Sequence, residues 1–132
     1  MIVVDASAMV DAVAGDAPDP ALLALLTEEP LHAPSLLDYE VTSAFRGHAL
    51  AGKLSDLRLS QAVDDYTAFR VERHSMTGVL GDILDMRHNF TAYDAAYAVL
   101  ALALEAPLAT CDAKLMAAAS VGVEVRLFAP TE

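Results

Sequence analysis

The sequence has little cysteine, no glycine-rich loop and no long apolar run, and each scarcity excludes a class of protein. Its single cysteine, Cys111, has no partner for an internal disulfide and suits a reducing compartment. The six glycines form neither a G-x-x-x-x-G-K-[ST] loop nor a G-x-G-x-x-G fingerprint, so we expect no phosphate-binding loop of either kind. The longest nearly uninterrupted apolar stretch, residues 95–104, is too short to cross a bilayer, and the N-terminus lacks the form of a signal peptide. We therefore expect a cytoplasmic protein without membrane contact.

Basic side chains are also scarce, and they are unevenly distributed. The formal net charge is −11, and the first 40 residues contain eight carboxylates but no lysine or arginine. Because phosphate contacts require basic side chains, we expect no direct binding to DNA, and any bound RNA should lie along residues 41–90. The candidate RNA contacts in that segment are Arg46, Lys53, Arg73 and Arg87.

Apolar side chains are abundant, at 55% of the sequence with a mean hydropathy of +0.40, so a packed core is expected. A length of 132 residues fits a single domain over residues 1–132. Predicted strands cover residues 2–4, 31–33, 71–73, 108–110 and 123–128. Predicted helices cover residues 7–14, 21–27, 35–51, 55–69, 77–87, 91–104 and 112–120. Alternating strands and helices predict an α/β fold of three layers, α/β/α, with a parallel sheet of about five strands.

Side chains of the capping type precede several predicted helices. Ser7 is expected to cap the first helix. Ser35-x-x-Asp38 and Thr91-x-x-Asp94 both have the form of a capping box. Such caps explain many polar residues without any function, and this interpretation stays open for Asp5 and Asp112 as well.

Four carboxylates nevertheless occupy positions that this fold should bring together. Asp5 and Asp112 follow predicted strands, and ligands of such sheets bind outside the carboxyl ends of the strands. Glu40 lies in the predicted helix that follows the second strand, and Asp94 lies in the first turn of the helix at residues 91–104. We expect all four to face one end of the sheet.

The physical case is strongest for Asp94. From Thr91 to Leu104 the only ionisable side chains are Asp94 and two tyrosines, and apolar residues surround the helix, which predicts burial. A buried carboxylate is costly unless it is paired or bound to a metal. Glu40 competes with Asp38 for the fourth position, and we favour Glu40 because the capping box gives Asp38 a local role.

Converging carboxylates repel one another unless a cation neutralises them. All-oxygen ligation suits Mg²⁺ or Mn²⁺, and such a site activates water for in-line displacement at phosphorus with one or two metals. The pattern therefore predicts metal-dependent phosphodiester chemistry.

Four short motifs, in order along the chain, resemble the signatures of PIN domains, and most closely those of VapC-type toxins from toxin–antitoxin pairs. The motifs are Val3–Ala8, Ala33–Ser35 with Glu40, Val41 and Arg46, Thr91–Tyr97 with Leu100 and Ala101, and Leu108–Leu115. The resemblance implies a parallel five-stranded sheet and an endoribonuclease that uses Mg²⁺ or Mn²⁺. Carried over residue by residue, the acidic metal site corresponds to Asp5, Glu40, Asp94 and Asp112, with Ser7 and Thr110 as supporting hydroxyls.

The same resemblance implies partners for the chain. It implies an RNA substrate, a homodimer and inhibition by a small antitoxin protein. The apolar helical pair at residues 35–69 would suit such protein contacts, although we expect most of its apolar side chains to pack within the domain.

Two other functions remain as alternatives. A phosphotransfer protein of the receiver type also places carboxylates at strand ends, but it requires an acidic pair where Ala6 and Ser7 follow Asp5. A catalytically idle PIN-like module that only binds proteins should have lost at least one of the four carboxylates.

Other residues with reactive side chains have plainer interpretations. Ser7 lacks the G-x-S-x-G setting of a hydrolase nucleophile, and Cys111 is expected to be a small buried residue. The four histidines show no zinc-ligand spacing, and we expect surface or core positions for His32, His48, His74 and His88.

Overall fold

A single parallel sheet organises the chain in the computed structural model, which describes residues 1–130. Thr131 and Glu132, which the predicted domain includes, lie outside the described residues. The strands are β1 (Ile2–Val4), β2 (Leu31–Pro34), β3 (Val71–His74), β4 (Leu108–Thr110) and β5 (Val125–Leu127). They are ordered β3-β2-β1-β4-β5, and every neighbouring pair is parallel. This confirms the predicted fold class.

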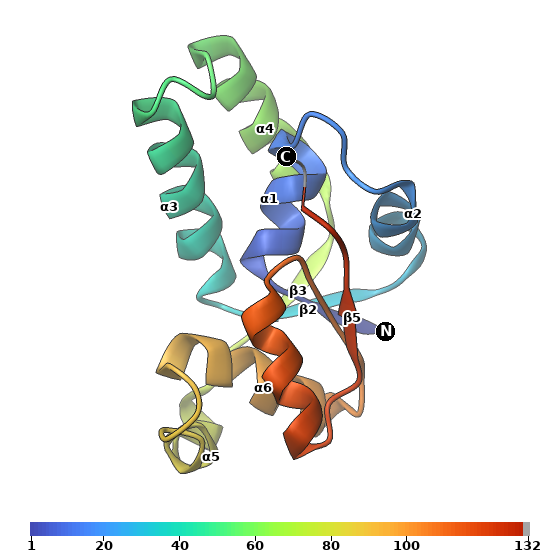
Figure 1. Cartoon of the computed structure of the whole chain (residues 1–132), viewed down its shortest axis with the longest axis vertical. Coiled ribbons are helices and arrows are strands. Elements are labelled where there is room, and N and C mark those ends of the chain that lie inside the picture. The colour runs from blue at the N-terminus through green and yellow to red at the C-terminus, as the bar shows by residue number, and fades with distance from the viewer. Residues whose placement is uncertain (131–132) are drawn as a thin grey trace.

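Helices cover both faces of the sheet and form the outer layers. They are α1 (Ala6–Ala14), α2 (Pro20–Glu28), α3 (Leu37–Leu50), α4 (Asp56–Ala68), α5 (Leu80–Asp85) and α6 (Ala92–Leu104). In Figure 1, α1, α3 and α4 lie on one side of the strands, and α5 and α6 lie on the other. Two 3₁₀ helices, Thr77–Val79 and Ala113–Val121, complete the described elements. No helix in this part of the chain is long and apolar enough to span a membrane.

The core is centred on β1 and α6. All three residues of β1 are fully buried, as expected for the middle strand of a sheet that is covered on both faces. In α6, seven consecutive residues from Ala95 to Ala101 are buried, so the middle of this helix is buried on all sides as predicted, while Tyr93 and Leu102 near its ends are exposed. Because the chain continues from β1 to β2 on one side and from β4 to β5 on the other, a crevice is expected at the carboxyl ends of β1 and β4.

Two of the predicted caps are wrong. The cap of α1 is Asp5, whose Oδ1 accepts a hydrogen bond from the amide of Ala8 at 3.0 Å, whereas Ser7 lies inside the helix. The predicted capping box of Ser35 and Asp38 does not form, because α3 starts after Leu36 without a side-chain cap. The Asp38 carboxylate instead points to more distant partners, and these bonds outcompete the local one.

Three predicted elements differ in extent or type. The helix expected at residues 77–87 divides into a 3₁₀ turn and the short α5. The helix expected after Asp112 is a 3₁₀ helix. The last strand is shorter than residues 123–128, because its partner β4 offers only three residues for pairing.

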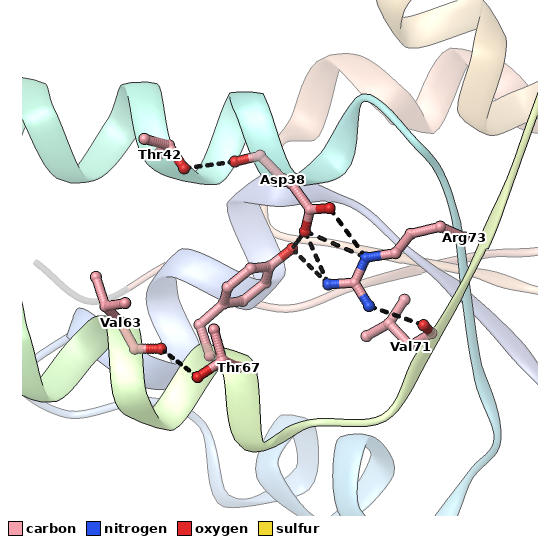
Figure 2. Close-up of polar contacts among 7 residues, drawn as sticks. Asp38, Thr42, Val63, Thr67, Val71 and Arg73 are labelled. Carbon is pink, nitrogen blue, oxygen red and sulfur yellow. Dashed lines mark hydrogen bonds and ion pairs between the residues drawn. The ribbon is translucent and has the colours of Figure 1, made fainter.

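A hydrogen-bonded cluster around Asp38 joins three elements, α3, α4 and β3 (Figure 2). Arg73 donates from Nη2 to Asp38 Oδ1 at 2.8 Å and from Nε to Oδ2 at 3.0 Å, and its Nη1 donates to the carbonyl of Val71 at 2.8 Å. The hydroxyl of Tyr66 donates to the same carboxylate at 2.6 Å. The bonds from Arg73 hold the pKa of Asp38 below its ordinary value. The guanidinium of Arg73 is therefore already occupied.

We expect Arg73→Gln to lower the free energy of unfolding by about 1 kcal/mol, because it removes charge-assisted bonds from a carboxylate that is partly open to solvent. Urea unfolding followed by circular dichroism measures the change. Arg70→Gln, at an exposed arginine three residues earlier, is the matched control and should change stability by less than about 0.5 kcal/mol. Equal losses in both variants would contradict the role given to the cluster.

Candidate active site

The carboxyl ends of β1 and β4 meet at a buried carboxylate, Asp5, which is 5% exposed. Its Oδ1 accepts hydrogen bonds from the hydroxyl of Ser7 at 2.8 Å and from the amide of Ala8 at 3.0 Å. Its Oδ2 accepts a bond from the hydroxyl of Thr110 at 2.6 Å. Residues from both strand ends and from α1 therefore fix the orientation of this carboxylate.

Backbone amides determine where the two hydroxyl protons point. The amide of Cys111 donates to Ser7 Oγ at 2.9 Å, and the amide of Asp112 donates to Thr110 Oγ1 at 2.9 Å. Each hydroxyl has a single proton, and with a backbone N–H filling one acceptor position that proton is directed toward Asp5. The two side chains are thus fixed donors to the carboxylate.

The environment of Asp5 opposes its negative charge. Burial raises its pKa to about 6, although the hydrogen bonds from Thr110, Ala8 and Ser7 lower it, and the nearby charge of Asp112 raises it slightly further. Three donors fill three of the roughly four acceptor positions of a carboxylate. Ser7 Oγ also lies 3.0 Å from Oδ2, so at most one position remains for a cation, which would also relieve the electrostatic cost.

Glu40 and Asp94 form the other half of the acidic site. Glu40 lies in the first turn of α3, and its Oε1 accepts a bond of 2.6 Å from the hydroxyl of Tyr97, which is 2% exposed. Burial raises the pKa of Glu40, and the negative charge of Asp94 raises it further. Asp94 lies in the first turn of α6, where its amide donates to the Thr91 hydroxyl at 3.1 Å. The Asp94 carboxylate is therefore not used as the cap.

Electrostatic interactions connect all four predicted carboxylates. Asp112 acts on Asp5, Asp94 acts on Glu40, and the charges of Glu40 and Asp5 both raise the pKa of Tyr97, which lies between the two pairs. These pairwise effects link the four predicted residues, which we call the acidic cluster. Among the described residues, no three of their carboxylates lie within 4.8 Å of one another, so a shared metal site stays a prediction. Asp38 has a partner other than the predicted helix amide, namely Arg73, and the choice of Glu40 as the fourth site residue stays a prediction.

An open cavity of about 940 Å³ lies beside this cluster. Its polar and charged lining consists of Ser7, Asp11, Asp16, Glu40, His48, Lys53 and Asp112. Sequence analysis missed Asp11 and Tyr97. Asp11 lies four residues after Ser7 on α1, and Tyr97 lies three residues after Asp94 on α6, so helical spacing could have indicated both.

Only one of the four candidate RNA contacts lines this cavity, namely Lys53. Arg46 lines a separate hollow together with Arg73, and the guanidinium of Arg73 is bound to Asp38. Arg87 donates to the carbonyl of Leu84 at 3.1 Å. The structure thus does not gather the predicted basic residues around the acidic cluster.

Comparisons with known proteins agree with the fold and the motifs. The family model of the PIN domain matches residues 2–121, and the chain therefore belongs to the PIN-domain family. Ribonuclease VapC1 of Mycobacterium tuberculosis is 39% identical over 95% of this chain and 96% of its own length. Ribonuclease VapC12 of the same species is 32% identical over 98% of this chain and 100% of its own. The chain is thus a homologue of the VapC ribonucleases.

A solved structure shares the fold. PAE2754 from Pyrobaculum aerophilum superimposes with a TM-score of 0.68 at 24% identity, covering 89% of this chain and 83% of that one. This likeness supports the order and layering of the elements.

We expect the raised pKa of Asp5 to appear as a pH-dependent loss of stability in metal-free protein. The folded state holds this proton more tightly than the unfolded state, so stability falls as pH rises from about 4 to about 6 and stays lower above that. The Asp5→Asn variant has no titrating group at this position. Between about pH 4 and about pH 6, its free energy of unfolding should therefore rise by roughly 2–3 kcal/mol relative to that of wild type. Urea unfolding in chelator at pH 4 to 7 measures the difference.

The exposed Asp64→Asn variant controls for the loss of a carboxylate elsewhere. Parallel pH curves for wild type and Asp5→Asn would show that the folded state does not raise the pKa of Asp5.

Proposed function

We propose that the chain is a metal-dependent endoribonuclease, the toxin of a type II toxin–antitoxin pair, and that it hydrolyses RNA phosphodiester bonds at the acidic cluster. The observation that carries the proposal is the buried Asp5 beside three further carboxylates, Asp112, Glu40 and Asp94. Such a cluster costs folding free energy through desolvation and repulsion. A divalent cation removes that cost and gives the cluster a chemical use.

The donor set fits Mg²⁺ or Mn²⁺. Asp5, Glu40, Asp94 and Asp112 offer only oxygen ligands, which these hard cations prefer. When bound, the metal would supply an activated water and stabilise negative charge on the phosphorus centre. The residues of the chain position the ligands: Ser7 and Thr110 hold Asp5, and Tyr97 holds Glu40.

Few of the candidate basic residues lie at the cavity beside the acidic cluster, so we propose that basic residues have a limited role in binding RNA. Lys53 is our first candidate for a phosphate contact, because it lines the same cavity as Glu40 and Asp112. Arg46 and Arg87 are second candidates, and we leave out Arg73 because Asp38 occupies it. The metal ions themselves then provide much of the positive charge that the substrate needs.

We also propose a cytoplasmic location, a homodimer and an antitoxin partner. VapC homologues and the exposed apolar side chains of the α3–α4 pair support these partners. Tyr39 is 79% exposed, Leu50 72% and Leu57 69%, so these three do not pack within the described part of the chain. Exposed apolar groups of this size commonly mark protein-binding surfaces.

We expect Asp94→Asn to reduce RNA cleavage by at least about 100-fold while the protein stays folded, because the carboxylate is a ligand candidate and not the cap of α6. The assay uses purified protein, free of antitoxin, on structured RNA with Mg²⁺ or Mn²⁺, and chelator should stop the reaction. Asp82→Asn, an exposed carboxylate in α5, is the matched control. Full activity in Asp94→Asn would refute this assignment, and absence of cleavage by wild type with either metal would favour a binding module.

We further propose that Tyr97 is a positioning residue for Glu40. Its hydrogen bond favours the ionised carboxylate, so Tyr97→Phe should raise the pKa of Glu40. Activity is expected to fall by roughly 10-fold, and the acid limb of the pH–rate profile should move to higher pH. Tyr93→Phe, at a tyrosine 65% exposed on the same helix, should leave both unchanged. A lower rate with an unmoved acid limb would indicate a purely structural role for Tyr97.

A further inference from the structure

Three potential metal ligands lie together at the edge of the sheet, on strands that contribute no residue to the acidic cluster. His32 comes from β2, and Glu72 and His74 come from β3. His32 Nδ1 lies 2.8 Å from His74 Nε2 and 3.4 Å from Glu72 Oε2. One donor atom from each of the three residues lies within 4.8 Å of the other two.

The strand register builds this cluster. His32 is the pairing partner of Glu72 in the parallel ladder, so their side chains leave the same face of the sheet. His74 follows Glu72 by two residues and shares that face, whereas Arg73 points to the opposite one and binds Asp38. Two hydrogen-bonded strands therefore hold the ligands, which gives the cluster a stiffer frame than a surface loop.

The side chains of the cluster differ in their exposure to solvent, and this difference suits a binding site. The His32 side chain is 12% exposed and is held within the sheet, while that of Glu72 is 68% exposed and free to adjust. A hollow of about 480 Å³ on the surface reaches both His32 and Glu72 and gives an ion access from solvent. The cluster thus combines a largely buried imidazole with an exposed carboxylate.

Distances between donor atoms allow a comparison with known coordination. At metal–ligand lengths of ~2.0–2.2 Å and tetrahedral angles, neighbouring ligand atoms lie ~3.3–3.6 Å apart. The separation of 3.4 Å between His32 Nδ1 and Glu72 Oε2 meets this value. The 2.8 Å between the imidazole nitrogens requires an opening of about 0.5 Å, because a shared proton now joins the rings where an ion would separate them. Small rotations of the two rings provide this opening.

We propose that His32, Glu72 and His74 form a second metal site, which binds a Zn²⁺-class transition-metal ion and leaves one coordination position open. Two imidazoles and one carboxylate are a known open zinc set, and imidazole nitrogen favours Zn²⁺ over Mg²⁺. The site is chemically distinct from the all-oxygen cluster at Asp5. It does not depend on the ribonuclease activity proposed above.

The position of the site indicates what binding would do. An ion held by both strands would fasten the edge strand β3 to β2. The carbonyl of His74 accepts bonds from the amide of Ser35 at 3.0 Å and from its hydroxyl at 3.2 Å, just before α3 begins. The same backbone that carries a ligand therefore holds the start of the helix on which Glu40 lies, and the ion should stabilise this part of the fold.

Calorimetric titration of metal-free protein with Zn²⁺ tests the proposal. The Asp94→Asn protein serves as the background, so that the acidic cluster is already impaired. We expect one ion to bind, and we expect Glu72→Gln and His74→Gln each to weaken binding by more than the roughly 10- to 100-fold that loss of an outer-shell partner costs. His88→Ala, at an exposed histidine outside the cluster, should leave affinity unchanged. At 100-fold excess over Kd, Zn²⁺ should raise the melting temperature by roughly 5–10 °C, whereas Mg²⁺ should not raise it in this background.

Spectroscopy identifies the ligands without any substitution at the cluster. Zn²⁺ should shift the ring nitrogen resonances of His32 and His74 while those of His88 stay in place, and Co²⁺ should give the visible absorption of a four-coordinate site. Unmoved resonances of His32 and His74 during Zn²⁺ binding would overturn the proposal. Equal affinity in Glu72→Gln, His74→Gln and the background protein would overturn it too.

Discussion

The hydrogen bonds to Asp5 connect the fold to the candidate site. The same Oδ1 that caps α1 through the amide of Ala8 also belongs to the carboxylate held by Ser7 and Thr110. The end of β1, the start of α1 and the end of β4 are therefore fixed by one side chain. Any change that moves this carboxylate displaces both the first helix and the centre of the acidic cluster. The hydrogen bonds that orient the carboxylate of Asp5 are therefore also bonds that stabilise the fold.

This arrangement keeps the carboxylate of Asp5 buried at the junction of β1, α1 and β4. Hydroxyl and amide donors lower the pKa of Asp5, yet burial outweighs them and raises it to about 6. A lysine or arginine beside Asp5 would lower the pKa of this carboxylate further. It would also neutralise the negative charge that attracts a metal ion. Under the proposed function, the acidic cluster is less stable in the free protein and binds a divalent ion more strongly, a trade often found at functional sites.

Local patterns in the sequence predicted the parts of the structure that depend on neighbours along the chain. The five predicted strands overlap the five observed ones, and the apolar residues around Asp94 predicted the buried middle of α6. Strand ends predicted the positions of Asp5 and Asp112, because parallel strands place their carboxyl ends at one edge of the sheet. These inferences require no knowledge of side-chain partners.

Local errors were small, such as Ser7 in place of Asp5 as the cap of α1, and what the sequence could not indicate concerns partners distant along the chain. The capping box of Asp38 loses to a guanidinium 35 residues away, and the hydroxyl that holds Glu40 comes from a residue 57 positions along the chain. Likewise, His32 and His74 have no metal-ligand spacing in sequence and become neighbours only through the register of β2 and β3. Strand register and helix packing decide such pairs, and neither follows from spacing along a single chain.

The acidity of the chain looks different once these contacts are known. Four of its carboxylates influence one another in pairs, Asp5 with Asp112 and Glu40 with Asp94, and one of its few arginines, Arg73, is bound to a fifth carboxylate, Asp38. Few free cations then remain near the cavity, with Lys53 on its wall. Under the proposed function, much of the positive charge that RNA needs would come from bound metal ions. The carboxylates repel a phosphate when no metal is bound, but they would hold the ions that attract it. Affinity for the metal and affinity for RNA should therefore rise and fall together.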